Sequence, residues 1–243
     1  GDVNQDGYDD FVIGAPRNGE VGTYAGQVYL ILGKETGWSL NTSLSNADAS
    51  FIANSPYDLA GYAVSGAGDV NGDGFADFLI TAFGSQSNGD SEYGKVYLFF
   101  GKAKPWAMDT PLSQAGASFV GERAFDRAGQ GLASLGDING DGCDDFAIGA
   151  PGADDGGNSA GKVYIVLGKS SGWSTNISLS TSYLTYWGET MGDRAGLSVA
   201  GVKNIVGSGS IGLLVGAPGN DESGYYNSGK SYLILLKGND IGP

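Results

Sequence analysis

The sequence contains no histidine and only one cysteine, Cys143, among 243 residues. Without histidine the usual zinc ligand and the usual general base are missing, which excludes Ser-His-Asp catalysis and histidine-ligated metal hydrolysis. A single cysteine cannot form an intrachain disulfide, and the cysteine count leaves the cellular compartment open. We interpret Cys143 as a loop position that tolerates any side chain, not as a reactive thiol.

Basic residues are also scarce, because 13 Lys plus Arg stand against 27 Asp plus Glu and the formal net charge is −14. Such a field repels nucleic-acid phosphates and anionic membrane surfaces, so we expect no nucleic-acid partner. No apolar run approaches the ~18 residues of a membrane span, and we expect no membrane insertion. The chain shows no signal-like start and no initiator Met, so we expect a mature or excised piece of a longer protein.

Helical periodicity is missing as well, whereas glycine is abundant, with 44 residues. Without a Gly-X-Y period, this glycine content is typical of many tight turns between short strands. Connecting segments such as NTSLSNADAS offer no crossover helix for a βαβ unit. The composition therefore predicts an all-β fold.

One acidic, glycine-punctuated pattern occurs three times, beginning at Asp2, Asp69 and Asp137, at spacings of 67 and 68 residues. The stretches GQVYLILGK, GKVYLFFGK, GKVYIVLGK and GKSYLILLK keep the same register. A tryptophan in each of three connectors is followed six residues later by leucine, at Trp38 and Leu44, Trp106 and Leu112, and Trp173 and Leu179. A fixed period of this kind predicts a repeat architecture such as a propeller or a solenoid.

Each repeat contains four stretches that we interpret as antiparallel strands separated by Gly, Asn, Ser and Pro clusters. The third stretch is apolar almost throughout, which is typical of a strand covered on both faces. A radial stack of four-stranded blades provides that cover, so we expect a β-propeller. The expected blades are residues 1–57, 58–125, 126–192 and 193–243, with the first lacking its first strand and the last lacking its fourth. We expect these to be about four blades of a larger propeller; a compact four-unit assembly, or one completed by a partner chain, stays open.

The three acidic loops have the composition of calcium sites. Positions 1, 3, 5 and 9 carry Asp or Asn, position 6 is Gly, and position 7 varies as expected where only the backbone carbonyl contributes. All-oxygen donors without His or thiolate favour calcium. An EF-hand is excluded because position 12 is Ile, not Glu. The predicted ligands are Asp2, Asn4, Asp6, Tyr8 and Asp10; Asp69, Asn71, Asp73, Phe75 and Asp77; and Asp137, Asn139, Asp141, Cys143 and Asp145.

An ordinary solvated turn is the alternative for one such loop, but three copies in register favour metal binding. The corresponding positions of the fourth unit carry no carboxylate, so we expect three calcium ions and none there; they are Asn204, Val206, Ser208, Ser210 and Gly212. With a dissociation constant of ~0.1 mM, ~1 mM calcium stabilises each loop by about 1.4 kcal/mol. Because cytosolic free calcium would not fill such sites, we expect an extracellular or cell-surface location.

The combination of DVNGDGFADFLI, IGAP and GKVYLFFG resembles FG-GAP repeats, the units of the integrin α-subunit β-propeller, over essentially the whole chain. The unit length and the GW-containing connector are most similar to repeats of large secreted or surface-bound bacterial proteins. The resemblance implies calcium in the loops between strands one and two. It also implies seven blades, three of them outside this chain.

We therefore expect a non-catalytic, calcium-rigidified module for adhesion or for recognition of an unidentified protein or glycan ligand. A lectin is one alternative, although the three connector tryptophans are more simply interpreted as packing their connectors against their own blades. A glycosidase or a scaffold attached to a hydrolase is another, with non-repeated acids as its candidates, namely Glu122, Glu189 and Asp90. Asn41 and Asn176 match the N-glycosylation sequon.

Overall fold

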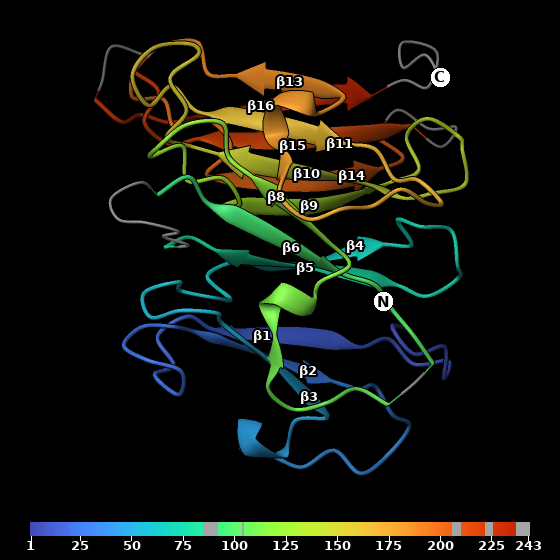
Figure 1. Cartoon of the computed structure of the whole chain (residues 1–243). Helices are drawn as coiled ribbons and strands as arrows, with labels where there is room; N and C mark the ends of the chain where they lie inside the picture. Colours follow the sequence, from blue (N-terminus) through green and yellow to red (C-terminus); the bar gives the residue numbers. More distant parts are fainter. Residues whose placement is uncertain (85–91, 104, 206–209, 222–225, 237–243) are drawn as a thin grey trace.

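The computed structural model describes residues 1–84, 92–103, 105–205, 210–221 and 226–236 (Figure 1). Within these ranges the regular structure is sixteen β-strands and three short 3-10 helices, with no α-helix. The all-β prediction is confirmed. No helix of the described residues has the length and apolar content needed to cross a membrane.

The strands are β1 (Phe11–Ala15), β2 (Gln27–Ile31), β3 (Ala49–Ile52), β4 (Val64–Gly68), β5 (Asp77–Ala82), β6 (Lys95–Phe99), β7 (Thr110–Pro111), β8 (Ala117–Val120), β9 (Gly131–Gly136), β10 (Asp145–Ala150), β11 (Lys162–Val166), β12 (Ile177–Ser178), β13 (Leu184–Trp187), β14 (Ser198–Lys203), β15 (Ile211–Ala217) and β16 (Lys230–Leu236). The 3-10 helices are η1 (Leu44–Asn46), η2 (Leu112–Gln114) and η3 (Leu179–Thr181).

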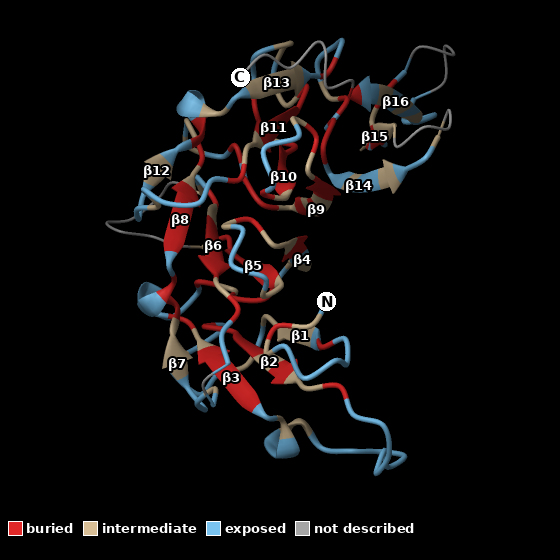
Figure 2. Cartoon of the chain, turned by 90° about the vertical axis from the view of Figure 1, so that its right-hand side faces the viewer, coloured by how far each residue is buried: buried red, intermediate tan, exposed pale blue. Residues whose placement is uncertain are grey.

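The strands form four sheets that follow one another in chain order. Their strand orders are β1-β2-β3-β7, β4-β5-β6-β8-β12, β9-β10-β11-β13 and β14-β15-β16. Figure 2 shows the sheets along an arc, with β1, β4, β9 and β14 on its inner side and β7, β8 and β12 on its outer side. Sheets fanned in this way around a common axis make the fold a β-propeller, as the sequence predicts.

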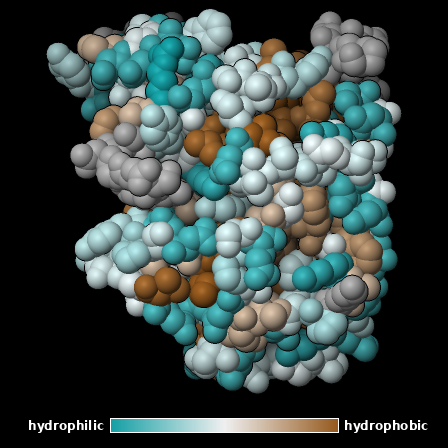
Figure 3. Space-filling model, viewed as in Figure 1, coloured by the Kyte–Doolittle hydropathy of each residue, from teal (hydrophilic) through white to brown (hydrophobic). Residues whose placement is uncertain are grey.

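The core lies in three apolar layers, one between each pair of adjacent sheets. Strands β5 and β10 are buried at every residue because each has a neighbouring sheet on both faces. By contrast, β1 and β16 retain exposed or half-buried residues at almost every position. The cover on both faces was predicted for the third strand of each unit. It is present for β6 and β11 of the middle sheets, whereas β16 of the last sheet alternates between exposed and half-buried residues. In the space-filling view hydrophilic residues occupy much of the surface, and hydrophobic residues emerge in separate patches (Figure 3).

The glycine of the repeated GAP segment allows adjacent sheets to approach closely. A Cβ on Gly149 would collide with the backbone carbonyl of Gly196, and a Cβ on Gly14 would collide with that of Gly61. Each pair joins one unit to the turn that begins the next. The recurrence of glycine at this position therefore has a packing cause.

The connector after the third strand of a unit reaches back to the preceding sheet. Strand β7 pairs in parallel with β3, and β12 pairs in parallel with β8. Trp106 packs against Phe51 of the preceding unit and Phe78 of its own unit. The ring partners of Trp173 are Phe100 and Phe119, both of the preceding unit. The expectation that each tryptophan packs its connector against its own blade is therefore met by Trp38 and Trp106, whereas the rings beside Trp173 belong to the preceding blade.

Candidate functional site

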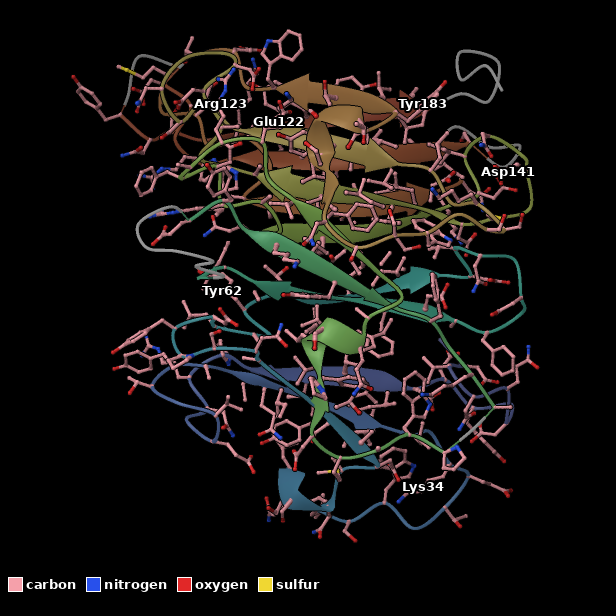
Figure 4. The ribbon with its side chains drawn as sticks, in the orientation of Figure 1. Lys34, Tyr62, Glu122, Arg123, Asp141 and Tyr183 are labelled. Atoms are coloured by element: carbon pink, nitrogen blue, oxygen red, sulfur yellow. The ribbon has the colours of Figure 1, made fainter. Side chains whose placement is uncertain are left out.

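The acidic loops lie at corresponding ends of successive sheets: residues 2–10 precede β1, residues 69–77 join β4 to β5, and residues 137–145 join β9 to β10. Backbone hydrogen bonds tie the first and second loops to the next unit. The Asp2 carbonyl accepts from Ala76 N at 3.0 Å, and the Asp69 carbonyl accepts from Asp144 N at 2.8 Å. Asp141 marks this rim in Figure 4.

Each loop orients its first carboxylate by the same backbone donors. Asp2 Oδ2 accepts from Gly7 N at 2.8 Å, and the Asp69 and Asp137 counterparts accept from Gly74 N and Gly142 N at 2.8 and 2.9 Å. The glycine has φ of 91°, 92° and 88° in the three loops, the left-handed region that glycine adopts readily. The predicted backbone bend at position 6 is therefore present.

The asparagine and the second aspartate of each loop form a pair, illustrated by the second loop. Asn71 Oδ1 accepts from Asp73 N at 3.0 Å, and Asp73 Oδ1 accepts from the position-7 residue, Phe75 N, also at 3.0 Å. The remaining oxygen, Asp73 Oδ2, accepts from Asn71 Nδ2 at 2.9 Å. The same three bonds recur in the first and third loops. A cation would replace the amide as the partner of this last oxygen.

The ninth residue of each loop is buried, and its carboxylate accepts hydrogen bonds from two segments of the chain. Asp77 Oδ2 accepts from Val70 N at 2.9 Å, and its Oδ1 accepts from Gly101 N at 2.8 Å. Asp10 and Asp145 bind the corresponding amides of their own units. These aspartates hold the loop against the connector that follows the third strand, so they have a structural role independent of any ligand.

The carboxylates of one loop act on one another electrostatically. Burial raises the pKa of Asp77 to about 7 and that of Asp145 to about 6, although the backbone N–H donors lower it. The charges of the first and fifth loop residues add to the increase, for example those of Asp69 and Asp73 on Asp77. Burial also raises the pKa of Asp10. The carboxylates at positions 1, 5 and 9 of each loop therefore repel one another, and their convergence on one ion stays a prediction.

The donor chemistry fits a hard cation, because each loop offers only carboxylate, amide and carbonyl oxygens. Among the described residues, however, no three acidic or thiol side chains are already gathered as at a formed metal site. The physical reason is that the carboxylate oxygens point at loop amides. The predicted ligand set therefore stays a prediction.

Position 7 behaves differently in the three loops. Tyr8 is exposed, Phe75 is half-buried and Cys143 is buried. Each donates its backbone N–H to the carboxylate of the fifth residue of its loop. Burial raises the pKa of the Cys143 thiol, which agrees with an unreactive cysteine.

The fourth unit is only partly described at the corresponding positions. Asn204 N donates to the Ser210 carbonyl at 2.7 Å, and Gly212 lies in β15. Val206 and Ser208 lie outside the described residues. The prediction that this unit binds no calcium therefore rests on its sequence alone.

The non-repeated acids lie away from these loops and form ion pairs. Glu122 Oε1 is 2.7 Å from Lys162 Nζ, and Figure 4 shows Glu122 toward the rim opposite Asp141. Lys162 is buried and also approaches Asp155 at 3.4 Å. Glu189 pairs with Lys230 at 3.0 Å. Asp90 lies outside the described residues. The buried Lys162 cluster could not be predicted from the sequence, since its members are 7 to 40 residues apart.

A family model described as FG-GAP repeat matches residues 1–31, 60–99 and 128–166. Integrin alpha-IIb of Mus musculus is 36% identical over 166 residues, which are 66% of this chain and 15% of that protein. Integrin alpha-V of Gallus gallus is 30% identical over 234 residues, 94% of this chain and 20% of that protein. Phosphatidylinositol-glycan-specific phospholipase D of Bos taurus is 31% identical over 170 residues, 67% of this chain and 19% of that protein. The chain therefore spans a fifth or less of the length of these relatives.

Proposed function

Because the chain belongs to the FG-GAP repeat family, we propose that it is a non-catalytic, calcium-binding propeller module for adhesion or ligand recognition at or outside the cell surface. The observation that carries the proposal is the threefold repetition of one loop geometry. In each loop, burial raises the pKa of the aspartate at position 9, and the charges of the first and fifth residues add to the increase. A divalent cation would offset that repulsion.

In each loop the residues at positions 1, 3 and 5 would supply side-chain oxygens to calcium, and position 7 would supply its carbonyl. In the second loop these are Asp69, Asn71, Asp73 and Phe75. The ninth residue, Asp77, already accepts one N–H on each oxygen, yet each carboxylate oxygen retains a second lone pair. The bound ion would supply rigidity and charge neutralisation, not chemistry on a substrate. We expect three ions in the chain.

Rigidity of these loops extends to the neighbouring units. The carbonyls of Val3 and Val70 accept from Lys102 N and Lys169 N, at 2.8 and 2.9 Å. The first and second loops are therefore each bonded to the connector of the following unit, and an ion that fixes such a loop would also fix that connector. This arrangement suits a scaffold that presents a binding surface in one shape.

We assign the propeller blades to residues 1–57, 58–125, 126–192 and 193–243, as part of a larger ring. The uncovered faces of β1 and β16 support this larger ring, since the corresponding faces of the middle sheets are buried. The acids named as candidates are engaged in ion pairs, Glu122 with Lys162 and Glu189 with Lys230, and we assign these pairs a structural role. A glycosidase screen of the chain and its Glu122→Gln variant tests this part.

Thermal unfolding in the presence of calcium, magnesium or chelator tests the calcium proposal. We expect ~1 mM calcium to raise the stability by about 4 kcal/mol over chelator when three loops bind with dissociation constants of ~0.1 mM. The triple variant Asp6→Asn, Asp73→Asn, Asp141→Asn changes an exposed residue of each loop and should lose the calcium effect. Equal melting curves in calcium and chelator would contradict the proposal.

A further inference from the structure

One turn on the rim opposite the acidic loops recurs at each junction between consecutive sheets. It reads YDLAG at the first junction, FDRAG at the second and GDRAG at the third, with Leu59, Arg127 and Arg194 at its third position. The backbone N–H of each of these residues donates to a carbonyl of the preceding unit, at 3.0, 3.2 and 3.1 Å, and the acceptors are Tyr24, Glu92 and Ser159. The three junctions therefore share one backbone frame and differ in their side chains.

At the second junction the arginine is paired with an acid. Arg127 Nε lies 2.7 Å from Glu92 Oε2, a carboxylate of the preceding unit. Two aromatic residues of the same unit as Glu92, Tyr62 and Phe83, pack on each other with ring centroids 4.4 Å apart. This copy of the junction shows that a glutamate fits beside the arginine of the turn.

At the third junction the corresponding positions carry smaller or neutral side chains. Ser159, Gln130 and Pro151 stand where the second junction has Glu92, Tyr62 and Phe83. A cavity of about 290 Å³ lies here, and these three residues line it together with Arg127 and Arg194. The cavity therefore corresponds to the space that an ion pair and two packed rings occupy one unit earlier.

Arg194 repeats the arginine of the second junction without its acid. It is exposed and forms no ion pair with any residue that the structure describes. The adjacent Asp193 is buried and accepts from Thr190 N at 3.0 Å and from Asn220 Nδ2 at 3.1 Å. In a chain with a net charge of −14, two guanidinium groups that line one cavity are a local exception.

The wall of this cavity is fixed by backbone contacts. Gly152 N donates to the Asp126 carbonyl at 3.1 Å, and a Cβ on Gly152 would lie 1.9 Å from the Phe125 carbonyl oxygen. Phe125, which is 58% exposed, and Leu197 add apolar surface to the lining. The site is therefore preorganised for a ligand group that combines a negative charge with apolar carbon.

We propose that this cavity binds the carboxylate of a glutamate side chain from a protein ligand, which occupies the place that Glu92 has at the second junction. The guanidinium of Arg194 donates to the carboxylate, and the methylene groups lie against Phe125 and Leu197. Arg127, whose Nε donates to Glu92, keeps its terminal N–H groups as further donors. The inference rests on the recognition role in the proposed function and names the ligand chemistry for that role.

The probe is the peptide N-acetyl-Gly-Glu-Gly-amide, titrated into the calcium-loaded full chain at ~0.15 M salt, where a Debye length of ~8 Å screens the net charge. The backbone N–H resonances of residues 194–197 should shift in a saturable manner, with a dissociation constant of about 1 mM for a ligand of this size. The matched peptide with Gln in place of Glu should bind at least about ten-fold more weakly, because its hydrogen bonds to the guanidinium lack the ligand charge.

Three variants of the chain test the assigned residues, and thermal unfolding checks the fold of each. Arg194→Gln should abolish binding, whereas Arg123→Gln, on the same rim but outside the cavity lining, should leave it unchanged (Figure 4). Ser159→Glu supplies the acid that the second junction has at Glu92. It should block the peptide and shift the resonances of the peptide-free chain toward those of the peptide-bound parent.

Equal binding of the Glu and Gln peptides, or binding that survives Arg194→Gln, would overturn the site. Glucuronate and inorganic phosphate distinguish other sources of negative charge, and either one binding as tightly as the Glu peptide would overturn the glutamate assignment. Calcium titration of the same sample, followed at the N–H resonances of Gly74 and Gly142, reports on the acidic loops at the opposite rim. A peptide that fails to bind while calcium binds therefore contradicts this site and leaves the calcium proposal intact.

Discussion

The carboxylate of Asp77 and the backbone N–H of Gly101 are joined by a 2.8 Å hydrogen bond across 24 residues. Asp77 begins β5, whereas Gly101 follows β6, so the bond closes the end of the acidic loop against the connector. Lys102, the next residue, donates its backbone N–H to the Val3 carbonyl of the preceding loop at 2.8 Å. The aspartate is consequently part of a chain of bonds that links two acidic loops.

Asp77→Asn should destabilise the calcium-free protein by about 1–3 kcal/mol, because the amide NH₂ would face a buried backbone donor. Urea unfolding in chelator measures the loss. Asp73→Asn is the matched control, since Asp73 is exposed, and its stability in chelator should change little. Equal losses in the two variants would argue against the structural role of Asp77.

In chelator the protein should become less stable as the pH rises from about 4 to 7. Burial raises the pKa of Asp77 to about 7 and that of Asp145 to about 6 in the folded state. The folded state therefore binds more protons than the unfolded state in this window, and stability falls as those protons leave. Urea unfolding at a series of pH values measures this slope, and Asp77→Asn should reduce it. Stability that increases over the same range would contradict the assigned shifts.

Gly149→Ala should destabilise the fold by about 1–3 kcal/mol, because the added Cβ would collide with the Gly196 carbonyl at the junction of two units. Gly66→Ala is the control, since a Cβ there has no atom within 4 Å. Thermal unfolding of the two variants compares them directly. A neutral Gly149→Ala would mean that the sheets approach less closely than described.

Phe51→Ala should cost about 3–5 kcal/mol, because it empties a groove lined by three aromatic rings. Phe11→Ala removes the same side chain from an uncovered groove and should cost much less in the isolated chain. Urea unfolding in calcium measures both losses. Similar values would show that the two grooves do not differ in occupancy.

The acidic loops and the repeat were predictable from sequence because their determinants are local. The Asp and Asn side chains of a loop accept hydrogen bonds from backbone amides of the same nine residues. Asp69, for example, accepts from Gly74 N, and Asn71 accepts from Asp73 N. The apolar third strands likewise indicated burial on both faces. These features depend on the identity of neighbouring residues and hardly on the rest of the chain.

The remaining features depend on distant contacts. The partner of Asp77 was not foreseen, although glycine recurs at Gly33, Gly101 and Gly168; at Gly101 a Cβ would lie 2.5 Å from the Ala76 carbonyl. Strands β7 and β12 have two residues each, too few for any periodicity, and they pair with a preceding unit. The groove that receives Phe51 was likewise invisible, because its walls come from segments far apart in the sequence.

Calorimetric titration of the full chain with calcium tests the central claim most directly. We predict three bound ions per chain and two in the Asp73→Asn variant, whose fold should be unchanged in chelator. Magnesium at the same concentration should give a weaker response, because it demands a stricter octahedron. A stoichiometry that stays the same in Asp73→Asn, or the absence of calcium binding by the folded chain, would contradict the account.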